Sequence, residues 1–458
     1  MRDPSEIFDR LRTAEESNPL PEVKTRISWL ERLRSAVLSR RADIRTAVWE
    51  DFRKSPVEAD LTESIPVLLE LKTALGNLAS WTAPKRLRST FPLWGLSSRL
   101  QHNPKGVVLI LSPWNYPVNL SLGPLVSALA AGNRVIVKPS ERVPHSSRLI
   151  ANLIGDALPE DVATVVEGGV EVGAELLNLP FDHFYFTGGA AVGKEIMHAA
   201  ARHLSSVTLE LGGKSPAVVD GSVDLDQCAE KIVRGKFMNG GQTCIAPDYV
   251  VVHDKLYDDF VKAILTHAVR IEARAEMSAL IDDRHEARLE AMLADAVKEG
   301  AILHHSDLHR SGLTIATGVP LTCKLMQEEI FGPILPVLRY RSEEELIGIV
   351  RTNPSPLTMY VFSNDDRLVN RLAAKLKTGS ICINETLLHF VHPHLPFGGV
   401  GQSGSGRSHG RAGFETFSNS VPIMRQNARR GIIPLVYPPK GRFGDWAREL
   451  LFRILGRW

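Results

Sequence analysis

The sequence predicts an α/β protein with more than one domain, and two observations carry this prediction. The chain has 458 residues, which is too long for one compact core and favours two or three domains. From Gly106 onwards, short apolar runs alternate with amphipathic stretches, as in βαβ units that build a parallel sheet with helices on both faces. Hydrophobic residues make up 44% and charged residues 23%, which argues against disorder.

The individual elements follow from the spacing of apolar residues. Residues 5–80 are expected to be helical, because apolar side chains recur at helical spacing from Trp29 to Leu38 and from Ile65 to Leu75. The alternating pattern then predicts strands at 107–111, 135–137, 163–166 and 183–186, with helices at 121–131, 145–156, 171–177 and 191–203. After Glu210 a second series predicts strands at 217–219 and 249–252 and helices at 226–238 and 257–273.

Composition excludes several classes of protein. No apolar run reaches the roughly 18 residues that span a bilayer, and the acidic N-terminus, which has no apolar core, is unlike a secretory signal. A cytoplasmic protein is therefore expected. The four cysteines are irregularly spaced, which fits neither a disulfide framework nor a zinc site. His389, His392 and His394 lack helical ligand spacing and stand in a Pro-rich loop, so no metal site is expected there.

Two short segments supply a nucleophile and a base. Cys244 ends the run Gly-Gly-Gln-Thr-Cys, and Glu210 opens the run Glu-Leu-Gly-Gly-Lys. A thiolate can attack an electrophilic carbon, and a carboxylate can take a proton from the thiol or from water. Either element alone is weak evidence, since free cysteines are usually small buried hydrophobes. Together they are sufficient for covalent acyl chemistry.

A glycine-rich turn predicts a dinucleotide site. The segment Phe-Thr-Gly-Gly-Ala-Ala-Val-Gly-Lys, which contains Gly188 and Gly193, follows a predicted strand and opens a predicted helix. A pyrophosphate is bound at such a helix N-terminus. The segment is not the GxGxxG fingerprint, and by itself such a turn is a weak signal.

The ordered series of motifs resembles the aldehyde dehydrogenase superfamily. The motifs are Ser112 to Pro117, Lys138 to Glu141, Phe186 to Gly189, Glu210 to Lys214, Gly241 to Cys244, Glu328 to Pro333 and Pro396 to Gly399. The longer runs from Thr208 to Pro216 and from Gly235 to Tyr249 resemble the class 3 and fatty aldehyde dehydrogenase branch.

This resemblance implies three structural units and a tail. A Rossmann-like NAD(P)-binding domain is expected at 1–81 and 103–209, and an α/β catalytic domain at 210–388. A small β oligomerisation arm is expected at 82–102 and 389–424, followed by a basic amphipathic tail at 425–458. The branch also implies a homodimer.

The resemblance also assigns cofactor residues. Lys138 and Glu141 match the pair that bonds the adenosine ribose, while Glu329 and Phe331 match the residues at the nicotinamide ribose and ring. A carboxylate at Glu141 accepts from both ribose hydroxyls and repels a 2′-phosphate, which favours NAD. NADP remains possible, because the branch often accepts both.

The implied reaction is the oxidation of an aldehyde to an acid. Cys244 attacks the carbonyl carbon, and the oxyanion needs preorganised donors, for which the Asn115 side chain and the Cys244 N–H are the candidates. Loss of one such donor typically costs about 3 kcal/mol. Hydride transfer from the thiohemiacetal leaves a thioester, and Glu210 then activates water.

An apolar tunnel is expected to select the substrate, which favours medium or long aliphatic or aromatic aldehydes. Its expected wall residues are Trp114, Tyr116, Asn119, Phe237, Met238, Ile245, Phe390 and Phe397. Two alternatives stay open: a CoA-acylating aldehyde dehydrogenase, against which Glu210 argues, and an inactive dehydrogenase scaffold that serves as a binding protein.

The C-terminal tail carries eight basic and two acidic residues, a net charge of +6. Residues 443–458 are expected to form an amphipathic helix, with Phe443 and Trp446 on its apolar face and Arg448 and Arg453 on the other. At 1.5 Å per residue such a helix reaches about 24 Å, which is short of the roughly 30 Å hydrocarbon core. It is expected either to lie on an anionic membrane surface or to cover the substrate funnel of its own dimer. No nucleic-acid partner is expected.

Overall fold

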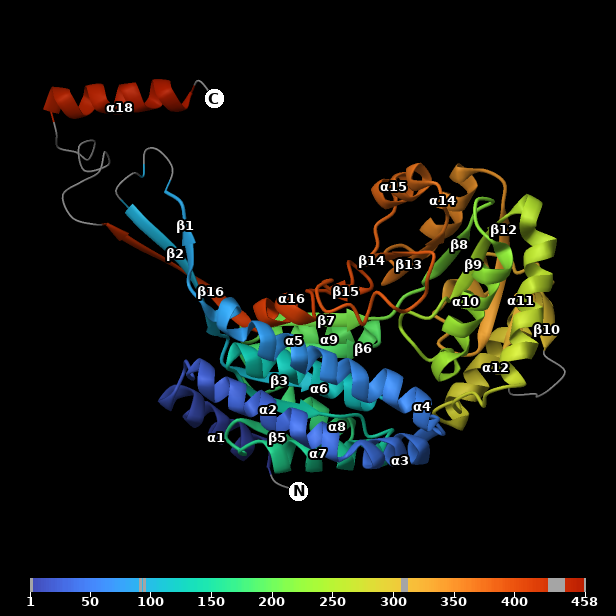
Figure 1. The fold of residues 1–458 in the computed structure, drawn as a ribbon, viewed down its shortest axis with the longest axis horizontal. Helices are drawn as coiled ribbons and strands as arrows, with labels where there is room; N and C mark the ends of the chain where they lie inside the picture. The colour runs from blue at the N-terminus through green and yellow to red at the C-terminus, as the bar shows by residue number, and fades with distance from the viewer. Residues whose placement is uncertain (1–2, 90–92, 94–95, 306–311, 427–440, 457–458) are drawn as a thin grey trace.

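The computed structural model describes residues 3–89, 93, 96–305, 312–426 and 441–456. Two α/β units lie next to each other, and a narrow β arm projects from the end of the first unit that lies away from the second (Figure 1). The predicted α/β class is confirmed.

The first unit is built on a six-stranded sheet in the order β15-β7-β6-β3-β4-β5. The strands are β3 (Val107–Leu111), β4 (Arg134–Lys138), β5 (Ala163–Val165), β6 (His183–Gly188), β7 (Ser206–Leu211) and β15 (Gly404–Ser405). All pairs are parallel except β15 with β7. The four strands predicted before Glu210 are observed, each within two residues of its expected bounds.

Helices cover both faces of this sheet, as its strand pattern requires. Val108 and Ile110 of β3 join one apolar cluster, whereas Val107 and Leu109 join another on the opposite face. The first cluster takes residues from α2 (Val23–Ser39), α3 (Arg41–Phe52), α5 (Ile65–Thr82), α6 (Pro117–Ala131) and α7 (Pro144–Ala157). The second takes residues from α1 (Pro4–Ser17), α8 (Val170–Leu176) and α9 (Ala190–Ala201).

The expected helical N-terminal region is observed as several helices, and the break between α3 and α5 has an unusual geometry. Between α3 and α5 the chain forms a single turn, α4 (Pro56–Ala59), and then a π-helix, η1 (Asp60–Ser64). π-helical turns are rare in proteins, and those that do occur are often found at functional sites. This turn carries charged residues that reach the site described below.

The second unit contains a seven-stranded sheet in the order β10-β11-β12-β9-β8-β13-β14. Its strands are β8 (Pro216–Val219), β9 (Tyr249–His253), β10 (Ile302–His305), β11 (Thr314–Thr317), β12 (Ile334–Tyr340), β13 (Thr358–Phe362) and β14 (Ser380–Ile383). Only β10 runs antiparallel to its neighbour. One face packs on α10 (Leu225–Phe237) and α11 (Tyr257–Glu272), and the other on α12 (Asp283–Lys298), α13 (Lys324–Gln327), α14 (Glu343–Arg351) and α15 (Asp366–Lys375). The short 3-10 turns η2 (Met238–Gly241) and η3 (Asp254–Leu256) follow α10 and β9.

The arm is an antiparallel sheet of β1 (Lys85–Leu87), β2 (Leu96–Pro104) and β16 (Ser418–Gln426). The segment expected to join it, 389–424, is divided. Its strand β15 pairs with β7, and Phe414 of α16 (Gly410–Thr416) lies in the core of the first unit, so the chain enters the arm only at Ser418. The assignment of functional domains stays a prediction.

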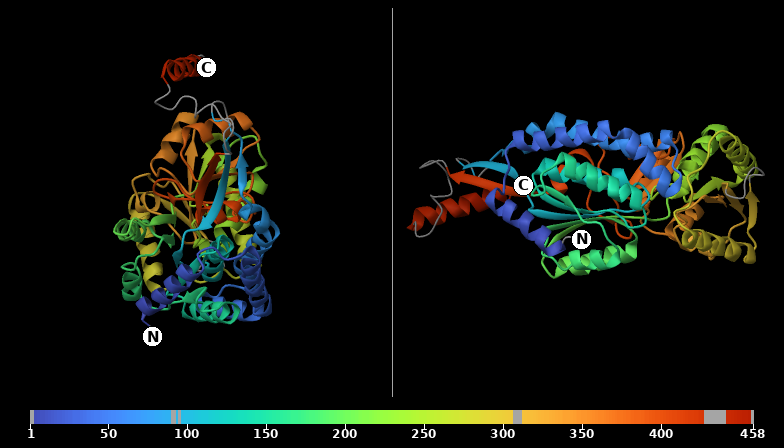
Figure 2. Two further views of the ribbon diagram at one scale, coloured as in Figure 1. Left: turned by 90° about the vertical axis from the view of Figure 1, so that its left-hand side faces the viewer. Right: turned by 90° about the horizontal axis from the view of Figure 1, so that it is seen from below.

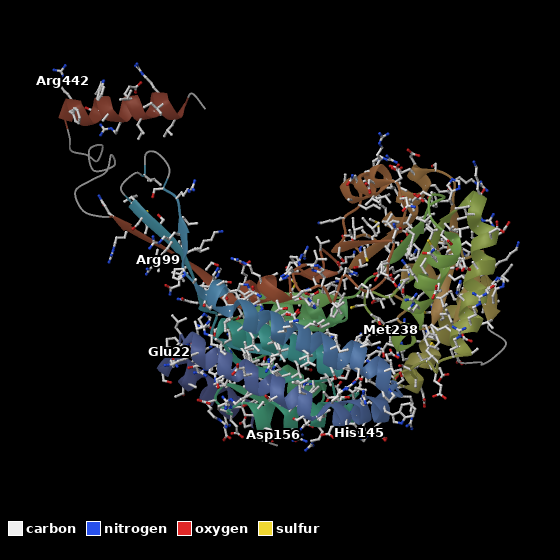
Figure 3. The ribbon with its side chains drawn as sticks, viewed as in Figure 1. Glu22, Arg99, His145, Asp156, Met238 and Arg442 are labelled. Carbon is white, nitrogen blue, oxygen red and sulfur yellow. The ribbon has the colours of Figure 1, made fainter. Side chains whose placement is uncertain are left out.

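The last described element is α18 (Gly441–Leu455). It lies beyond the far end of the arm, apart from both α/β units (Figures 1 and 2), with Arg442 at its start (Figure 3). Phe443, Trp446 and Phe452 are 60%, 59% and 76% exposed. A helix is therefore present where an amphipathic one was expected, while Arg429, Arg430, Lys440, Arg457 and Trp458 lie outside the described residues. Within the described part of the chain, no helix is both long and apolar enough to cross a bilayer.

Candidate active site

Cys244 stands in a tight loop that only glycine-rich sequence can form. Asn239, Gly240 and Gly241 all have positive φ, at 54°, 59° and 72°. A Cβ atom on Gly241 would collide with the carbonyl oxygen of Gly332, so a side chain is excluded there. Cys244 is only partly buried, in contrast to the other three cysteines. Burial and the nearby carboxylates of Glu329 and Glu210 raise the pKa of the Cys244 thiol, so it needs a base to become a nucleophile.

Glu210 is the residue predicted to be that base, and it lines the same two cavities as Cys244. It lies near the end of β7, where its backbone pairs with Thr187 on one side and Gly404 on the other. Its Oε1 accepts a hydrogen bond from Ser408 Oγ at 3.1 Å, whereas Oε2 is buried without a partner among the described residues. Burial raises the pKa of Glu210 to about 8. A carboxyl with such a pKa can both accept and return a proton near neutrality.

Asn115 is bonded directly to the loop of the nucleophile. Its Nδ2 donates to the carbonyl oxygen of Gln242 at 3.0 Å, and its own carbonyl oxygen accepts from Asn239 Nδ2 at 3.0 Å. The loop after β3 and the loop after α10 are therefore held together. Asn115 is buried, and its role as an oxyanion donor stays a prediction.

Two cavities meet at Cys244, Glu210 and Thr187, which line both of them. The walls of the first, called here the acyl cavity, are mostly apolar and include Leu69, Glu70, Asn119, Phe390, Phe397, Ser408 and His409. The walls of the second, called here the nicotinamide cavity, include Trp114, Asn115, Gly188, Gly189, Gly212, Glu329 and Phe331. One thiol is thus accessible from two sides.

The residues expected to form the substrate tunnel are divided between several places. Asn119, Phe390 and Phe397 line the acyl cavity. Trp114 lines the nicotinamide cavity instead, with its ring 5.4 Å from that of Phe331. Tyr116 is buried, and its hydroxyl bonds Thr243 Oγ1 at 2.6 Å.

The remaining tunnel residues surround the nucleophile loop. Ile245 packs in an apolar cluster with Cys244 and Phe397. Phe237 lines a separate cavity beside α12, and Met238 lies where the two α/β units meet (Figure 3). No direct role in substrate binding has been tested for these side chains, and all of these assignments stay predictions.

The nicotinamide cavity fits a dinucleotide. Gly189 caps the N-terminus of α9 without any side-chain hydrogen bond, which leaves backbone N–H groups for a pyrophosphate. Gly193 lets α9 pack on β7, because a Cβ atom there would lie 2.9 Å from Leu211. A Cβ atom on Gly212 would collide with Glu329.

Glu329 and Phe331 show signs of a functional position. Burial, together with Asp248, raises the pKa of Glu329 to about 8. Phe331 has φ of 52°, a conformation that is strained for a bulky residue and often marks a ligand site. At the far end of the predicted cofactor site, Lys138 Nζ lies 3.2 Å from Glu141 Oε2, and the Glu141 side chain is 43% exposed. These residues could hold the nicotinamide and adenosine halves of NAD(P).

A buried cluster of charged side chains in the segment between α3 and α5 was not predicted from the sequence. Lys54 Nζ lies 2.6 Å from Glu63 Oε1, and both side chains are completely buried. Glu63 Oε2 accepts from the backbone N–H groups of Val118 and Asn119 at 3.1 and 3.0 Å. Glu58 accepts from the N–H of Asn239 at 2.5 Å. The segment from Arg53 to Ser64 is mostly polar in sequence, so nothing in it indicated that these charges would be buried.

His389, one of the three clustered histidines, lies partly buried beside strand β13. His389 Nε2 bonds Thr358 Oγ1 at 2.7 Å, and burial lowers the pKa of His389 to about 4. Within the described ranges, no group of three His, Cys, Asp or Glu side chains could hold a metal ion.

Comparison with known proteins agrees with this geometry. Residues 6–422 match the model of the aldehyde dehydrogenase family. A probable coniferyl aldehyde dehydrogenase of Pseudomonas aeruginosa is 40% identical, over 98% of this chain and 96% of that protein. Mouse aldehyde dehydrogenase family 3 member A2 is 38% identical, over 97% and 93% of the two chains.

Solved structures show the same arrangement. The substrate-bound state of Staphylococcus aureus AldH has a TM-score of 0.92 at 35% identity, covering 98% of this chain and 100% of that one. Betaine aldehyde dehydrogenase of the same organism, solved with NAD+, has a TM-score of 0.84 at 27% identity, covering 93% and 88%.

Proposed function

Because the chain belongs to the aldehyde dehydrogenase family, it oxidises aldehydes to acids with NAD(P), and we propose that medium or long aliphatic and aromatic aldehydes are its substrates. The observation that carries this proposal is the meeting of two cavities at one thiol, Cys244. An aldehyde enters from the acyl cavity, and the dinucleotide lies in the other.

The residues divide the reaction into two halves. Glu210 takes the proton of the Cys244 thiol, and the sulfur bonds the carbonyl carbon while Asn115 Nδ2 donates to the oxyanion. A dinucleotide held beside Glu329 and Phe331 would supply the hydride acceptor, and loss of the hydride from the carbon bonded to Cys244 leaves a thioester on that residue. After the first proton has passed to solvent, Glu210 takes a proton from water, the hydroxide bonds the acyl carbon, and the carbon–sulfur bond breaks to release the acid and the Cys244 thiolate.

The substrate class rests on the lining of the acyl cavity, whose walls are mostly apolar and aromatic. Such walls select apolar groups by burial. Relatives point the same way, since their names specify coniferyl aldehyde and 4,4'-diaponeurosporen-aldehyde.

Initial rates of NADH formation with a series of linear aldehydes and with cinnamaldehydes test the proposal. We expect the highest kcat/KM for the longer or aromatic members and none for the Cys244→Ser variant. A preference for short or charged aldehydes would contradict the substrate class, and normal turnover by Cys244→Ser would contradict the nucleophile.

A CoA-acylating reaction is the alternative. It has no need of a base for water, whereas the free Oε2 atom of Glu210 is buried at the meeting point of the two cavities. Product analysis with and without CoA separates the two reactions, and we expect the free acid in both cases.

We also infer a homodimer in the cytoplasm, formed through the arm. Strand β16 is at the edge of the arm sheet, and its residues are mostly exposed, so its free backbone groups can pair with another chain. Sedimentation analysis of the intact chain tests the dimer, and a monomer at micromolar concentration would contradict it.

The exposed aromatic side chains and basic residues of α18 favour contact with an anionic membrane surface.

A further inference from the structure

Ser408 connects the base to a histidine in the wall of the acyl cavity. Its hydroxyl oxygen lies 3.1 Å from Glu210 Oε1 and 3.0 Å from His409 Nδ1. Ser408 and Glu210 are both buried, and the sequence separates them by 198 residues. The loop that carries Ser408 reaches the base because β15 pairs with β7 at Glu210 itself.

The hydroxyl has one proton and several neighbouring groups that could accept it. Besides Glu210, the carbonyl oxygen of Phe397 lies 3.2 Å from Ser408 Oγ, but that carbonyl already accepts from the Ser408 N–H at 2.7 Å. An ionised carboxylate is the stronger acceptor, since charge-assisted hydrogen bonds are about twice as strong as neutral ones. The hydroxyl proton therefore goes to Glu210 when that group is ionised.

This choice fixes the tautomer of His409. Since Ser408 gives its proton to Glu210, the nitrogen of His409 that faces Ser408 Oγ must carry a proton of its own. Burial and the nearby His389 lower the pKa of His409 to about 4, so the ring is neutral and donates from Nδ1. A hydroxyl that accepts in this way becomes a better donor to the carboxylate.

The backbone at His409 is held in an unusual conformation. Its φ is 71°, a region that few residues other than glycine adopt. The N–H of Gly410 donates to Glu70 Oε2 at 3.0 Å, and the ring packs edge-on against Phe390 at 4.6 Å. Backbone strain that is held in place by the surrounding structure is typical of functional positions.

We propose that Ser408 and His409 are positioning residues for hydrolysis: His409 orients the Ser408 hydroxyl, which favours the ionised form of Glu210 and aims it at the attacking water. The proposal rests on the proposed function. It assigns a role to the step after hydride transfer, in which Glu210 takes a proton from water and the acyl–sulfur bond breaks.

Other groups near Glu210 and His409 do not replace this contact. The charge of Arg407 also lowers the pKa of Glu210, but by less than the hydrogen bond from Ser408 does. Tyr185 also makes a hydrogen bond with Ser408, and burial raises the pKa of Tyr185 well above its usual value, so it is neutral. The Cys244 thiol, His389 and Glu70 complete the titratable groups that face these two residues in the described structure.

The first test is the pH profile of kcat for Ser408→Ala, from about pH 6 to about pH 10. Loss of the hydrogen bond raises the pKa of Glu210, so the acid limb of the profile should move up by about one pH unit or more. Near neutral pH the rate should fall about tenfold, and it should recover at high pH. Ser408→Thr, which keeps the hydroxyl, should retain the original profile.

Rapid mixing of Ser408→Ala with aldehyde and NAD identifies the affected step. The amplitude of the NADH burst should stay stoichiometric while the turnover that follows it slows, because formation of the thioester precedes the hydrolysis that Ser408 assists. The matched control is Ser405→Ala, which removes an exposed hydroxyl from the same strand that pairs with β7. It should leave both readouts unchanged.

The histidine is tested by two substitutions of similar size. His409→Asn keeps an N–H donor and should retain most of the activity, whereas His409→Leu should shift the acid limb as Ser408→Ala does. If all variants fold with the acid limb at its original position, the inference is wrong. If wild-type protein forms no NADH with any aldehyde, the proposed function fails instead, so the two failures are distinguishable.

Discussion

Lys54 Nζ donates a hydrogen bond to the backbone carbonyl oxygen of Asn115 at 3.1 Å, although 61 residues separate them in the chain. The same ammonium group lies 4.1 Å from the ring centre of Tyr116. Glu63 binds the first N–H groups of α6. The segment from Lys54 to Glu63, between α3 and α5, therefore contacts the Asn115 loop on both sides. The N-terminal region thus supports the active site as well as the sheet beneath it.

Substitution of Lys54 by Met should reduce both stability and turnover. It leaves Glu63 buried without its counter-ion, which typically costs about 3–5 kcal/mol of unfolding free energy. The double variant Lys54→Met, Glu63→Leu should recover much of this loss but not kcat, because the Asn115 carbonyl then keeps only its Asn239 donor and lacks the ammonium group. Urea unfolding and steady-state rates measure the two effects, and Lys24→Met, at an exposed position, is the control. Full recovery of kcat in the double variant would contradict a role in positioning.

Glu70→Gln should stabilise the protein at alkaline pH. Burial raises the pKa of Glu70 from 4.5 to about 7, so the folded chain binds this proton more tightly than the unfolded chain does. The contribution of protonated Glu70 to the unfolding free energy is therefore fully present below pH 4.5 and is lost as the pH rises through 7. At pH 8 the variant should gain up to about 3 kcal/mol, and near pH 4 it should gain nothing. Unfolding curves at the two pH values measure this gain in unfolding free energy, and Glu31→Gln, at an exposed position, is the control. An equal gain at both pH values would show that ionisation of Glu70 is not its cause.

Glu141→Ala should change the choice of cofactor. The Glu141 carboxylate lies beside Lys138 and is 43% exposed, so its repulsion of a 2′-phosphate is partly screened by solvent. We expect the ratio of kcat/KM for NADP to that for NAD to rise about tenfold, which corresponds to about 1.4 kcal/mol. Steady-state rates with both cofactors measure it. An unchanged ratio would mean that Glu141 does not contact the ribose.

Deletion of residues 441–458 should abolish binding to anionic vesicles while the oxidation of a soluble aldehyde continues. The apolar side chains of α18 are exposed, and its Arg residues favour acidic headgroups. Co-sedimentation with vesicles that contain phosphatidylserine measures binding, and neutral vesicles are the control. Unchanged sedimentation would remove the membrane hypothesis. A changed preference for long aldehydes would instead indicate that the helix covers the substrate funnel.

The amino-acid sequence predicted the strands of the first unit and the residues proposed for the chemistry, but not the turn between α3 and α5 or most elements between α11 and α18. Strand β3 and the glycine-rich turn at Gly188 were predictable because periodicity and glycine positions act over a few neighbours. Cys244 and Glu210 were recognisable because each stands in a short motif. The tertiary structure confirmed the α/β class and placed both residues at the meeting of two cavities.

Contacts between distant segments were decided only by the tertiary structure. Nothing near Ser408 in the sequence indicates Glu210, because their contact depends on the pairing of β15 with β7. Lys54 and Asn115 likewise meet because α3 and α6 pack on the same face of one sheet. Trp114 lies in the nicotinamide cavity for a similar reason, since the direction of a side chain after a strand depends on how the loop packs. Sequence motifs thus indicated which groups we propose to react, and long-range packing determined which groups contact them.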